Sequence, residues 1–399
     1  MAVTLVLRFA DVGVATYASL RLVGEPARTV TWVVQEAELV AALDQISTAL
    51  PDPIAPETRR DAVARAIARG PFSEPATELA IARALGLGLL PPAAWQLLIN
   101  CVASPRAALF VSPSARLARV PWGLVAMPGD DGFRLMELAD VLMAAPSNIV
   151  NAARTPESWD ERRGEPPLLL LDPRVPGQRP DSALGSVLGR PSAETPLAQH
   201  FTELMRQQEV LPDVTTAVEL FRRTDADHPW LGRQLDRRPS RLLYVGHATA
   251  ADGDVGHADR AALHLADERP LTAADLMSAK LPMPPRIAMI ACASGGDYQF
   301  DEATGLVAAM ILGGAQLVTA TLWSLPTTSG YRQFAPAAAD HDPMAEAIIA
   351  VDRAHQGPDA GRAVNGWQRE QMRRWRDGDI SASPLYWAAL ATFAVDGAR

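Results

Sequence analysis

The chain has 399 residues, enough for two or three domains with a large core. Apolar residues make up 48% of it, but no run of 18 uncharged apolar residues occurs, so the composition disfavours a membrane protein. The formal net charge of −9 disfavours a nucleic-acid-binding protein, because phosphate contacts require a basic surface.

The first hundred residues predict strands followed by helices. The N-terminus lacks a basic start before a long apolar stretch, so we expect a first strand there and no signal peptide. Three alternating runs separated by turn residues predict an antiparallel β-meander: Val3–Phe9, Val14–Leu22 and Thr29–Val34. The apolar period then becomes helical, and short helices are expected at Ala37–Ala49, Glu57–Ala68, Glu78–Leu85 and Ala93–Cys101. A tetratricopeptide-like repeat is the alternative for these helices, but its 34-residue pattern is absent.

The next segment reaches a candidate domain boundary. Strand-like runs are expected at Ala107–Val111, Leu117–Val125 and Asp140–Pro146, and Ser147 is a candidate helix N-cap. Residues 154–167 are polar with Pro and Gly, which is typical of a linker or exposed loop. We therefore expect an N-terminal α/β half over residues 1–160 and a second α/β domain over residues 161–399.

The second domain alternates apolar strands with amphipathic helices. Expected strands are Leu168–Leu171, Arg241–His247, Ala262–Ala266, Arg286–Cys292, Gln316–Leu322 and Leu385–Val395. Expected helices are Pro196–Gln208, Pro229–Leu235, one opened by Thr272, Thr304–Leu312, Pro343–His355 and Arg362–Arg376. The Pro-, Gly- and Ser-rich residues 172–195 form the longest candidate flexible loop. This alternation predicts an α/β fold with a mostly parallel sheet and helices on both faces.

The cysteine content limits the chemistry that the chain can support. Cys101 and Cys292 are its two cysteines, too few for a disulfide framework, so we expect a cytoplasmic protein. No CxxC motif and no cluster of His and Cys occurs, so neither a structural zinc site nor another cofactor is expected. Cys101 lies in a helical apolar run and is predicted to be core.

His247 and Cys292 each follow a short apolar strand. Side chains just past the carboxyl ends of neighbouring parallel strands enter the same crevice. A thiol and an imidazole that meet there form a nucleophile and its base. Their separation of 45 residues is close to the spacing of about 50 in caspases. The structural alternative is a buried cysteine and a satisfied histidine, but two complementary groups at two strand ends are harder to explain by packing.

The other candidates for chemistry are weaker. His257 and His264 flank the loop after His247, and we expect them to be incidental to the site. The histidines in polar surroundings are predicted to be solvated: His200, His228, His341 and His355. No G-x-S-x-G nucleophile elbow and no phosphate-binding loop occurs, which disfavours a serine hydrolase and a nucleotide-binding enzyme.

Several motifs in order resemble the CHAT proteases, a caspase-like group related to separase. Landmarks similar to those of the family run from Val120-Pro-Trp122 and Ala145-Pro-Ser147 in the N-terminal half to Ser383-Pro-Leu-Tyr-Trp387 near the end. Between them lie Leu242-Leu-Tyr-Val-Gly-His247, Ala262-Leu-His-Leu265, Leu271-Thr-Ala-Ala-Asp-Leu276, Ile287-Ala-Met-Ile-Ala-Cys-Ala-Ser-Gly295, Asp301-Glu-Ala-Thr-Gly-Leu306, Gly313-Gly-Ala315 and Val318-Thr-Ala-Thr-Leu-Trp323. The resemblance implies a caspase-like catalytic domain over residues 161–399.

The resemblance also implies the roles of individual residues. His247 and Cys292 would form a catalytic dyad, with N–H groups of Gly246, Ala248 and Cys292 holding the oxyanion. The family often has Gly directly after the histidine, and Ala248 at that position restricts the backbone. Apart from the resemblance, four residues are candidates for a substrate pocket, three carboxylates suited to a basic side chain and one aromatic wall: Asp252, Asp254, Asp267 and Trp323. The alternatives, which the sequence leaves open, are solvated carboxylates and a tryptophan packed in the core.

We therefore expect a cysteine endopeptidase that cleaves specific proteins. The resemblance further implies control by a regulatory protein or ligand and a role in bacterial anti-phage defence. The main alternative is a catalytically inactive caspase-like interaction module, and a third possibility is an amidase or acyltransferase with the same dyad. No direct nucleic-acid or membrane partner is expected. The sequence leaves open the residue before the cleaved bond, the protein substrate, the activating signal, the oligomeric state and whether the loop over residues 172–195 is processed.

Overall fold

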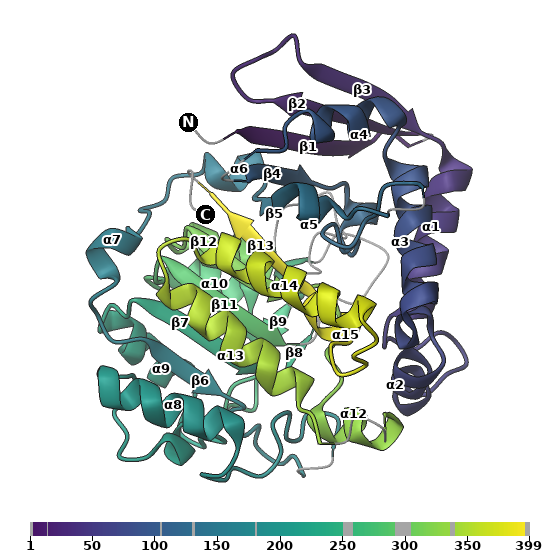
Figure 1. Cartoon of the computed structure of the whole chain (residues 1–399). Coiled ribbons are helices and arrows are strands. Elements are labelled where there is room, and N and C mark those ends of the chain that lie inside the picture. The colour runs from purple at the N-terminus through teal and green to yellow at the C-terminus, as the bar shows by residue number, and fades with distance from the viewer. Residues whose placement is uncertain are drawn as a thin grey trace.

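A ten-stranded sheet forms the centre of the molecule (Figure 1). The computed structural model describes residues 3–13, 15–103, 106–129, 132–179, 182–249, 258–291, 305–335 and 340–395. The sheet order is β3-β2-β1-β4-β5-β13-β12-β11-β7-β6. Its strands are β1 (Thr4–Asp11), β2 (Thr16–Leu22), β3 (Thr29–Val34), β4 (Ala107–Ser112), β5 (Ala139–Ala144), β6 (Leu168–Leu171), β7 (Arg241–Gly246), β11 (Arg286–Ala291), β12 (Leu317–Thr321) and β13 (Leu390–Ala394).

The sheet consists of two parallel blocks that meet in opposite directions. The strands β6, β7, β11 and β12 are parallel to one another, and so are β1, β4, β5 and β13. The blocks join where β12 pairs antiparallel with β13, while β1, β2 and β3 form the predicted antiparallel meander at one edge. Every residue of β6, β7 and β11 is buried, as expected for parallel strands covered on both faces. The predicted fold class is therefore confirmed.

Helices cover both faces of the sheet (Figure 1). On one face, α13 (Pro343–Gln356) packs on β7 and β11, and α14 (Ala360–Arg376) packs on β5 and β13. On the other face, α10 (Ala273–Ala279) packs against α11 (Leu306–Leu312), which contacts β12. The remaining helices are α1 (Glu36–Ala49), α2 (Arg59–Ala68), α3 (Pro75–Leu89), α4 (Pro92–Ile99), α5 (Leu135–Leu138), α6 (Ser147–Val150), α7 (Trp159–Arg162), α8 (Pro196–Gln207), α9 (His228–Asp236), α12 (Thr328–Phe334) and α15 (Pro384–Trp387).

Two further features lie outside the main sheet. A small antiparallel sheet of β8 (Ala248–Thr249), β9 (Ala262–Leu263) and β10 (Leu271–Thr272) follows β7 directly. In addition, α2 packs against α12, although their sequences lie far apart (Figure 1).

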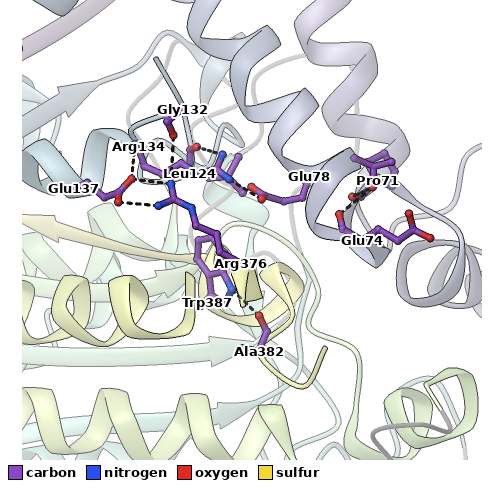
Figure 2. Close-up of polar contacts among 11 residues, drawn as sticks. Pro71, Glu74, Glu78, Leu124, Gly132, Arg134, Glu137, Arg376, Ala382 and Trp387 are labelled. Atoms are coloured by element: carbon purple, nitrogen blue, oxygen red, sulfur yellow. Dashed lines mark hydrogen bonds and ion pairs between the residues drawn. The ribbon is translucent and has the colours of Figure 1, made fainter. Parts of the chain in front are cut away.

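One buried ion pair and one partly exposed ion pair link α3, α5 and α14 (Figure 2). The Arg134 guanidinium donates to the Glu78 carboxylate at 2.6 Å and to the Leu124 carbonyl at 3.0 Å, and both charged side chains are almost fully buried. Next to this pair, Arg376 from α14 binds the Glu137 carboxylate at 2.8 and 2.9 Å. Strands from both sides of residue 160 share one sheet, because β5 pairs with β13. The boundary between residues 1–160 and 161–399 stays a prediction.

Three of the expected strands are wrong in whole or in part, the mildest case being Ala262–Ala266, of which only Ala262–Leu263 forms a strand. Leu117–Val125 forms no strand but a 3₁₀ turn over Ala115–Leu117 and successive turns around Pro121. Its apolar residues are buried there without a sheet partner, so burial and not strand pairing explains the pattern. At Leu385–Val395, the strand begins only at Leu390, because the Ser383 hydroxyl caps α15 by accepting from the Leu385 N–H at 3.3 Å.

Within the described ranges, no single helix is long and apolar enough to span a membrane, although α3 and α4, bent by 105° at their junction, pass that test together on length and composition alone.

Candidate active site

The register of β7 and β11 sets the geometry of the candidate site. Gly246, the last residue of β7, is the partner of Ala291, the last residue of β11. His247 follows Gly246 in the chain, and Cys292 follows Ala291 but lies outside the described residues. Because the two strands are parallel, both chains leave the sheet at the same edge.

Close packing at this edge requires glycine before the histidine. A Cβ atom on Gly246 would lie 2.7 Å from the Tyr244 hydroxyl and 2.9 Å from Cζ of the same ring. That hydroxyl lies 2.6 Å from the His247 carbonyl oxygen, which also accepts from the His264 N–H at 2.9 Å. The backbone of His247 is therefore fixed from two sides.

The imidazole of His247 is held in one tautomer. Its side chain is 9% exposed, and Nε2 lies 2.9 Å from the carbonyl oxygen of Gly185. A carbonyl oxygen can only accept a hydrogen bond, so Nε2 carries the proton. In the neutral ring this leaves Nδ1 with the lone pair that can accept a proton.

A buried ion pair holds the Gly185 carbonyl in place. Asp172, directly after β6, is fully buried, and its Oδ1 lies 3.3 Å from Nη1 of Arg222. The same Nη1 donates to the Gly185 carbonyl at 3.1 Å, so guanidinium and imidazole share one acceptor. The other carboxylate oxygen, Oδ2, accepts from the Ser186 hydroxyl at 2.7 Å and from the Val187 N–H at 3.1 Å. This part of the loop, which the sequence predicted to be flexible, is thus tied to the end of β6.

Both members of this pair adopt backbone conformations that non-glycine residues seldom take. Asp172 has φ of 51° and Arg222 has φ of 54°, in the left-handed region. Such conformations cost free energy and persist where surrounding contacts determine them. Here the contacts are the ion pair and the hydrogen bonds that lead to His247.

His247 borders an open cleft with a volume of about 430 Å³, within the range of ligand-binding pockets. One wall comes from α2 and the residues before it, and another comes from α12. The described lining residues are Pro51, Arg59, Arg60, Val63, Ser182, Ala183, Ser186, Val187, His247, Ser324, Leu325, Pro326, Thr327, Ser329, Gly330, Gln333 and Phe334. The cleft therefore joins the N-terminal helices to the strand end that carries the imidazole.

The CHAT domain family model matches residues 79–397, most of the chain. The chain belongs to the CHAT domain family.

The solved structures give a more distant likeness. Two crystal structures of the Saccharomyces cerevisiae separase–securin complex, at 3.0 and 2.6 Å resolution, are similar to this chain with TM-scores of 0.48 and 0.46 and identities of 11% and 10%. They cover 99% and 98% of this chain, which spans 30% of the matched chain in each structure. No curated protein sequence matches.

The structure describes two of the four predicted pocket residues of this CHAT domain, Trp323 and Asp267. Trp323 is fully buried, its Nε1 donates to the Leu385 carbonyl at 3.0 Å, and its ring packs near Phe72. Asp267 lies 3.8 Å from His228 Nδ1. Neither Trp323 nor Asp267 is among the described residues that line the cleft. The other two predicted pocket residues, Asp252 and Asp254, lie outside the described residues, as does His257.

Two of the three predicted oxyanion groups, those of Gly246 and Ala248, lie at the end of β7. Gly246 ends β7, and Ala248 begins β8, where it pairs with Leu263. The third group belongs to Cys292, outside the described residues. Their role as hydrogen-bond donors to an oxyanion stays a prediction.

The remaining histidines of the CHAT domain differ from the sequence expectation in part. His264 lies near His247, and burial, together with the charge that His247 can carry, lowers the pKa of His264. His355 was predicted to be solvated but is fully buried, with Nε2 2.8 Å from Thr319 Oγ1; burial and the nearby Arg286 lower its pKa to about 3. The same expectation is wrong for His200, whose Nε2 lies 2.8 Å from the buried Asp352 carboxylate. Cys101 is buried in the core, as predicted.

Sequence reasoning missed the residues that support the imidazole. Asp172 follows a fully apolar strand, so the strand-end argument used for His247 could also have found it. Gly185 and Arg222 act through a carbonyl and a distant side chain, and no motif indicates them. Among the described residues, no group of three or more His, Cys, Asp and Glu could hold a metal ion.

Proposed function

We propose that this CHAT domain is a cysteine endopeptidase in which His247 and Cys292 form the catalytic dyad. The observation that carries the proposal is the register of the two strands, because the residues directly before the dyad, Gly246 and Ala291, are paired across the sheet. Consecutive Cα atoms are about 3.8 Å apart, so Cys292 starts one residue beyond a strand end that already neighbours His247. The open cleft beside His247 supplies room for a peptide.

In the proposed reaction, His247 Nδ1 takes the thiol proton of Cys292, and the sulfur attacks the carbonyl carbon of the peptide bond. The carbonyl π electrons move to the oxygen, which N–H groups of Cys292, Gly246 and Ala248 stabilise. Collapse of this intermediate breaks the C–N bond, and the imidazolium gives its proton to the departing amine. A thioester between substrate and Cys292 remains.

Hydrolysis then regenerates the dyad. A water molecule gives a proton to His247 Nδ1 while its oxygen attacks the thioester carbon. The C–S bond breaks, the carboxyl product leaves, and the sulfur regains a proton from the imidazolium. Throughout both steps the Gly185 carbonyl accepts from Nε2–H and keeps Nδ1 available for proton transfer.

We further propose that the protein cleaves one or a few proteins under the control of a partner or ligand, in the cytoplasm and in defence against phage. A cysteine nucleophile must stay reduced, and a reducing compartment such as the cytoplasm keeps it so.

Substrate trapping tests the proposed function. The full chain with Cys292→Ala is incubated with a lysate of its source cells, which contains the natural partners, and retained proteins are identified by mass spectrometry. We expect at least one retained protein that gains a new N-terminus when it is incubated with the wild-type chain in the same lysate. His247→Ala should give no such cleavage while retaining the wild-type thermal midpoint to within a few degrees.

Cleavage by the Cys292→Ala chain would contradict the proposal. Absence of cleavage by the wild-type chain, with retained partners present, would favour the alternative of an inactive interaction module.

A further inference from the structure

We infer that two copies of this chain associate through β3, which pairs antiparallel with β3 of the second copy around a two-fold axis. The two ten-stranded sheets then form one continuous sheet across the dimer. This interaction goes beyond the proposed peptidase function and does not depend on it.

The two edges of the main sheet differ in how their backbone groups are paired. At the β6 edge, the Leu169 N–H donates to the Leu211 carbonyl at 2.8 Å. At the end of the same strand, the Arg222 N–H donates to the Leu171 carbonyl at 3.1 Å. The opposite edge is β3 (Figure 1), and within the described ranges neither a strand nor an isolated bridge pairs with its outer side. A strand edge of this kind is a template for a further strand.

The two longest breaks in the described chain lie far from this edge. Residues 250–257 and 292–304 follow β7 and β11, and β11 is already the seventh strand from β3 along the sheet. Neighbouring strands are about 4.8 Å apart, which places β11 about 34 Å from β3 along the sheet. The breaks next to β1 and β2, at residues 1–2 and 14, are too short to pair along the six residues of β3.

The register of the meander shows which backbone groups of β3 point outward. The Leu22 N–H donates to the Arg28 carbonyl at 3.1 Å, where the pairing between β2 and β3 begins. In an antiparallel ladder, hydrogen-bonded pairs alternate with pairs whose backbone groups point away from each other. The N–H and carbonyl groups of Thr29, Thr31 and Val33 therefore point away from β2, and all three residues are exposed.

The residues of β3 are complementary to their own copies in an antiparallel pair. With Thr31 opposite Thr31 on the two-fold axis, Thr29 lies opposite Val33, and these residues exchange hydrogen bonds through their outward groups. Val30 then lies opposite Trp32, on the face of β3 where both side chains are half-buried. Pairs of β-branched and aromatic residues on neighbouring strands are favourable, so this register joins side chains that suit each other.

The sequence of β3 also lacks the features with which edge strands avoid such pairing. None of its six residues is charged and none is proline. A charged residue on the two-fold axis would face its own copy and repel it. The interior strands β1 and β2 do carry charged residues, which are Arg8, Asp11 and Arg21. The meander is therefore uncharged in the strand where charge would prevent association.

Sedimentation velocity of the full chain over a range of concentrations measures the association. We expect a reversible dimer with a dissociation constant on the order of 10 µM, since small interfaces are weak. Thr31→Lys places two like charges opposite each other and should raise the dissociation constant about fivefold or more. Thr48→Lys, which adds the same charge at an exposed residue of α1, should leave it unchanged. Cys292→Ala should dimerise like the wild type.

A mixture of two variants tests the register. Thr31→Lys and Thr31→Glu each repel their own copy, but across the two-fold axis their opposite charges attract. At low ionic strength the equimolar mixture should form a heterodimer about fivefold or more tighter than the dimer of either variant alone, which native mass spectrometry identifies. Lysine and other charged residues are common on natural edge strands, so both variants should fold, which circular dichroism checks.

The outcomes separate this inference from the proposed function. A wild-type chain that stays monomeric at about 100 µM would overturn the inference. A dimer that Thr31→Lys leaves intact would overturn it too, because another surface would then hold the two copies, and so would a mixture that gains no affinity. An intact dimer without proteolysis would refute the peptidase alone, whereas proteolysis by a monomer would refute the dimer alone.

Discussion

The two ends of β7 and β11 both have buried charged groups nearby, and the cleft lined by His247 lies at the carboxyl end. At the amino end, Arg241 and Arg286 are register partners. The Arg241 guanidinium binds Oδ1 of Asp352 at 2.7 Å, and the Arg286 guanidinium lies 3.7 Å from the centre of the Trp159 ring. None of these four side chains is among the described residues that line the cleft around His247.

At the carboxyl end, the corresponding partners are Gly246 and Ala291, and the buried ion pair Asp172–Arg222 lies beside them. Here the pair contacts the Gly185 carbonyl, which in turn accepts from the imidazole that borders the cleft. Burial and ion pairing therefore do not by themselves indicate a functional site. What distinguishes the carboxyl end is that its hydrogen bonds lead to a titratable group at an opening.

Asp352→Asn should have the largest effect on stability. Removal of one charge leaves Arg241 buried without its partner, and broken buried pairs cost about 3–5 kcal/mol. Burial alone would raise the pKa of Asp352, but Arg241 and His200 outweigh it and lower that pKa to about 2, against 3.8 for an ordinary Asp. The carboxylate's contribution is therefore complete above about pH 4 and is lost as the pH falls through 2.

Urea unfolding of the wild type and of Asp352→Asn at pH 7, 4 and 3 measures this contribution. We expect the free-energy difference between the two proteins to be similar at pH 7 and pH 4 and smaller at pH 3. The alkylation rate of Cys292 should stay within about twofold of the wild-type rate while the protein is folded. A large loss of reactivity would show that the two ends of the strands do not differ in function.

Asp172→Asn should have the smaller effect on stability but the larger effect on the site. The substitution keeps the shape of the side chain but removes the charge that pairs with Arg222, so the Gly185 carbonyl loses its fixed position. Misplacement of a catalytic group by about 1 Å can cost 10²-fold in rate, and we expect Cys292 to be alkylated about 10- to 100-fold more slowly.

Two further variants separate positioning from a general loss of structure. Asp213→Asn removes an exposed partner of Arg237 and should leave the rate unchanged. Arg222→Lys keeps the positive charge and should therefore retain more of the wild-type rate of Cys292 alkylation than Arg222→Met does. If Asp172→Asn unfolds at lower urea but reacts at the wild-type rate, its role is structural alone.

The sequence predicted those parts of the site that depend on local pattern. The apolar runs before His247 and Cys292 predicted two strands, which the structure shows as parallel neighbours with Gly246 and Ala291 as partners. The same pattern failed for Leu117–Val125, where buried apolar residues lie in turns, since burial and strand pairing produce similar runs. His355 also failed, because its polar neighbours in sequence are not its neighbours in space.

The rest of the site depends on contacts between distant segments. Arg59 and Arg60 reach the cleft only because α2 packs against α12, more than 260 residues later in the chain. The support of His247 by Gly185 runs through a backbone carbonyl, which carries no residue-type signal. Such contacts require the tertiary structure.

The activation of Cys292 by His247 is the central claim, and the rate of thiol alkylation tests it most directly. The full-length wild-type and His247→Ala chains are treated with iodoacetamide at pH 6.5, and the modification of each cysteine is followed by mass spectrometry. An ordinary thiol, with a pKa near 8.5, is only about 1% thiolate at this pH.

We predict that Cys292 reacts at least about tenfold faster than a cysteine in an unstructured peptide, that His247→Ala abolishes this advantage, and that the buried Cys101 stays unmodified in both. Equal rates for Cys292 in the wild type, in His247→Ala and in the peptide would contradict the dyad.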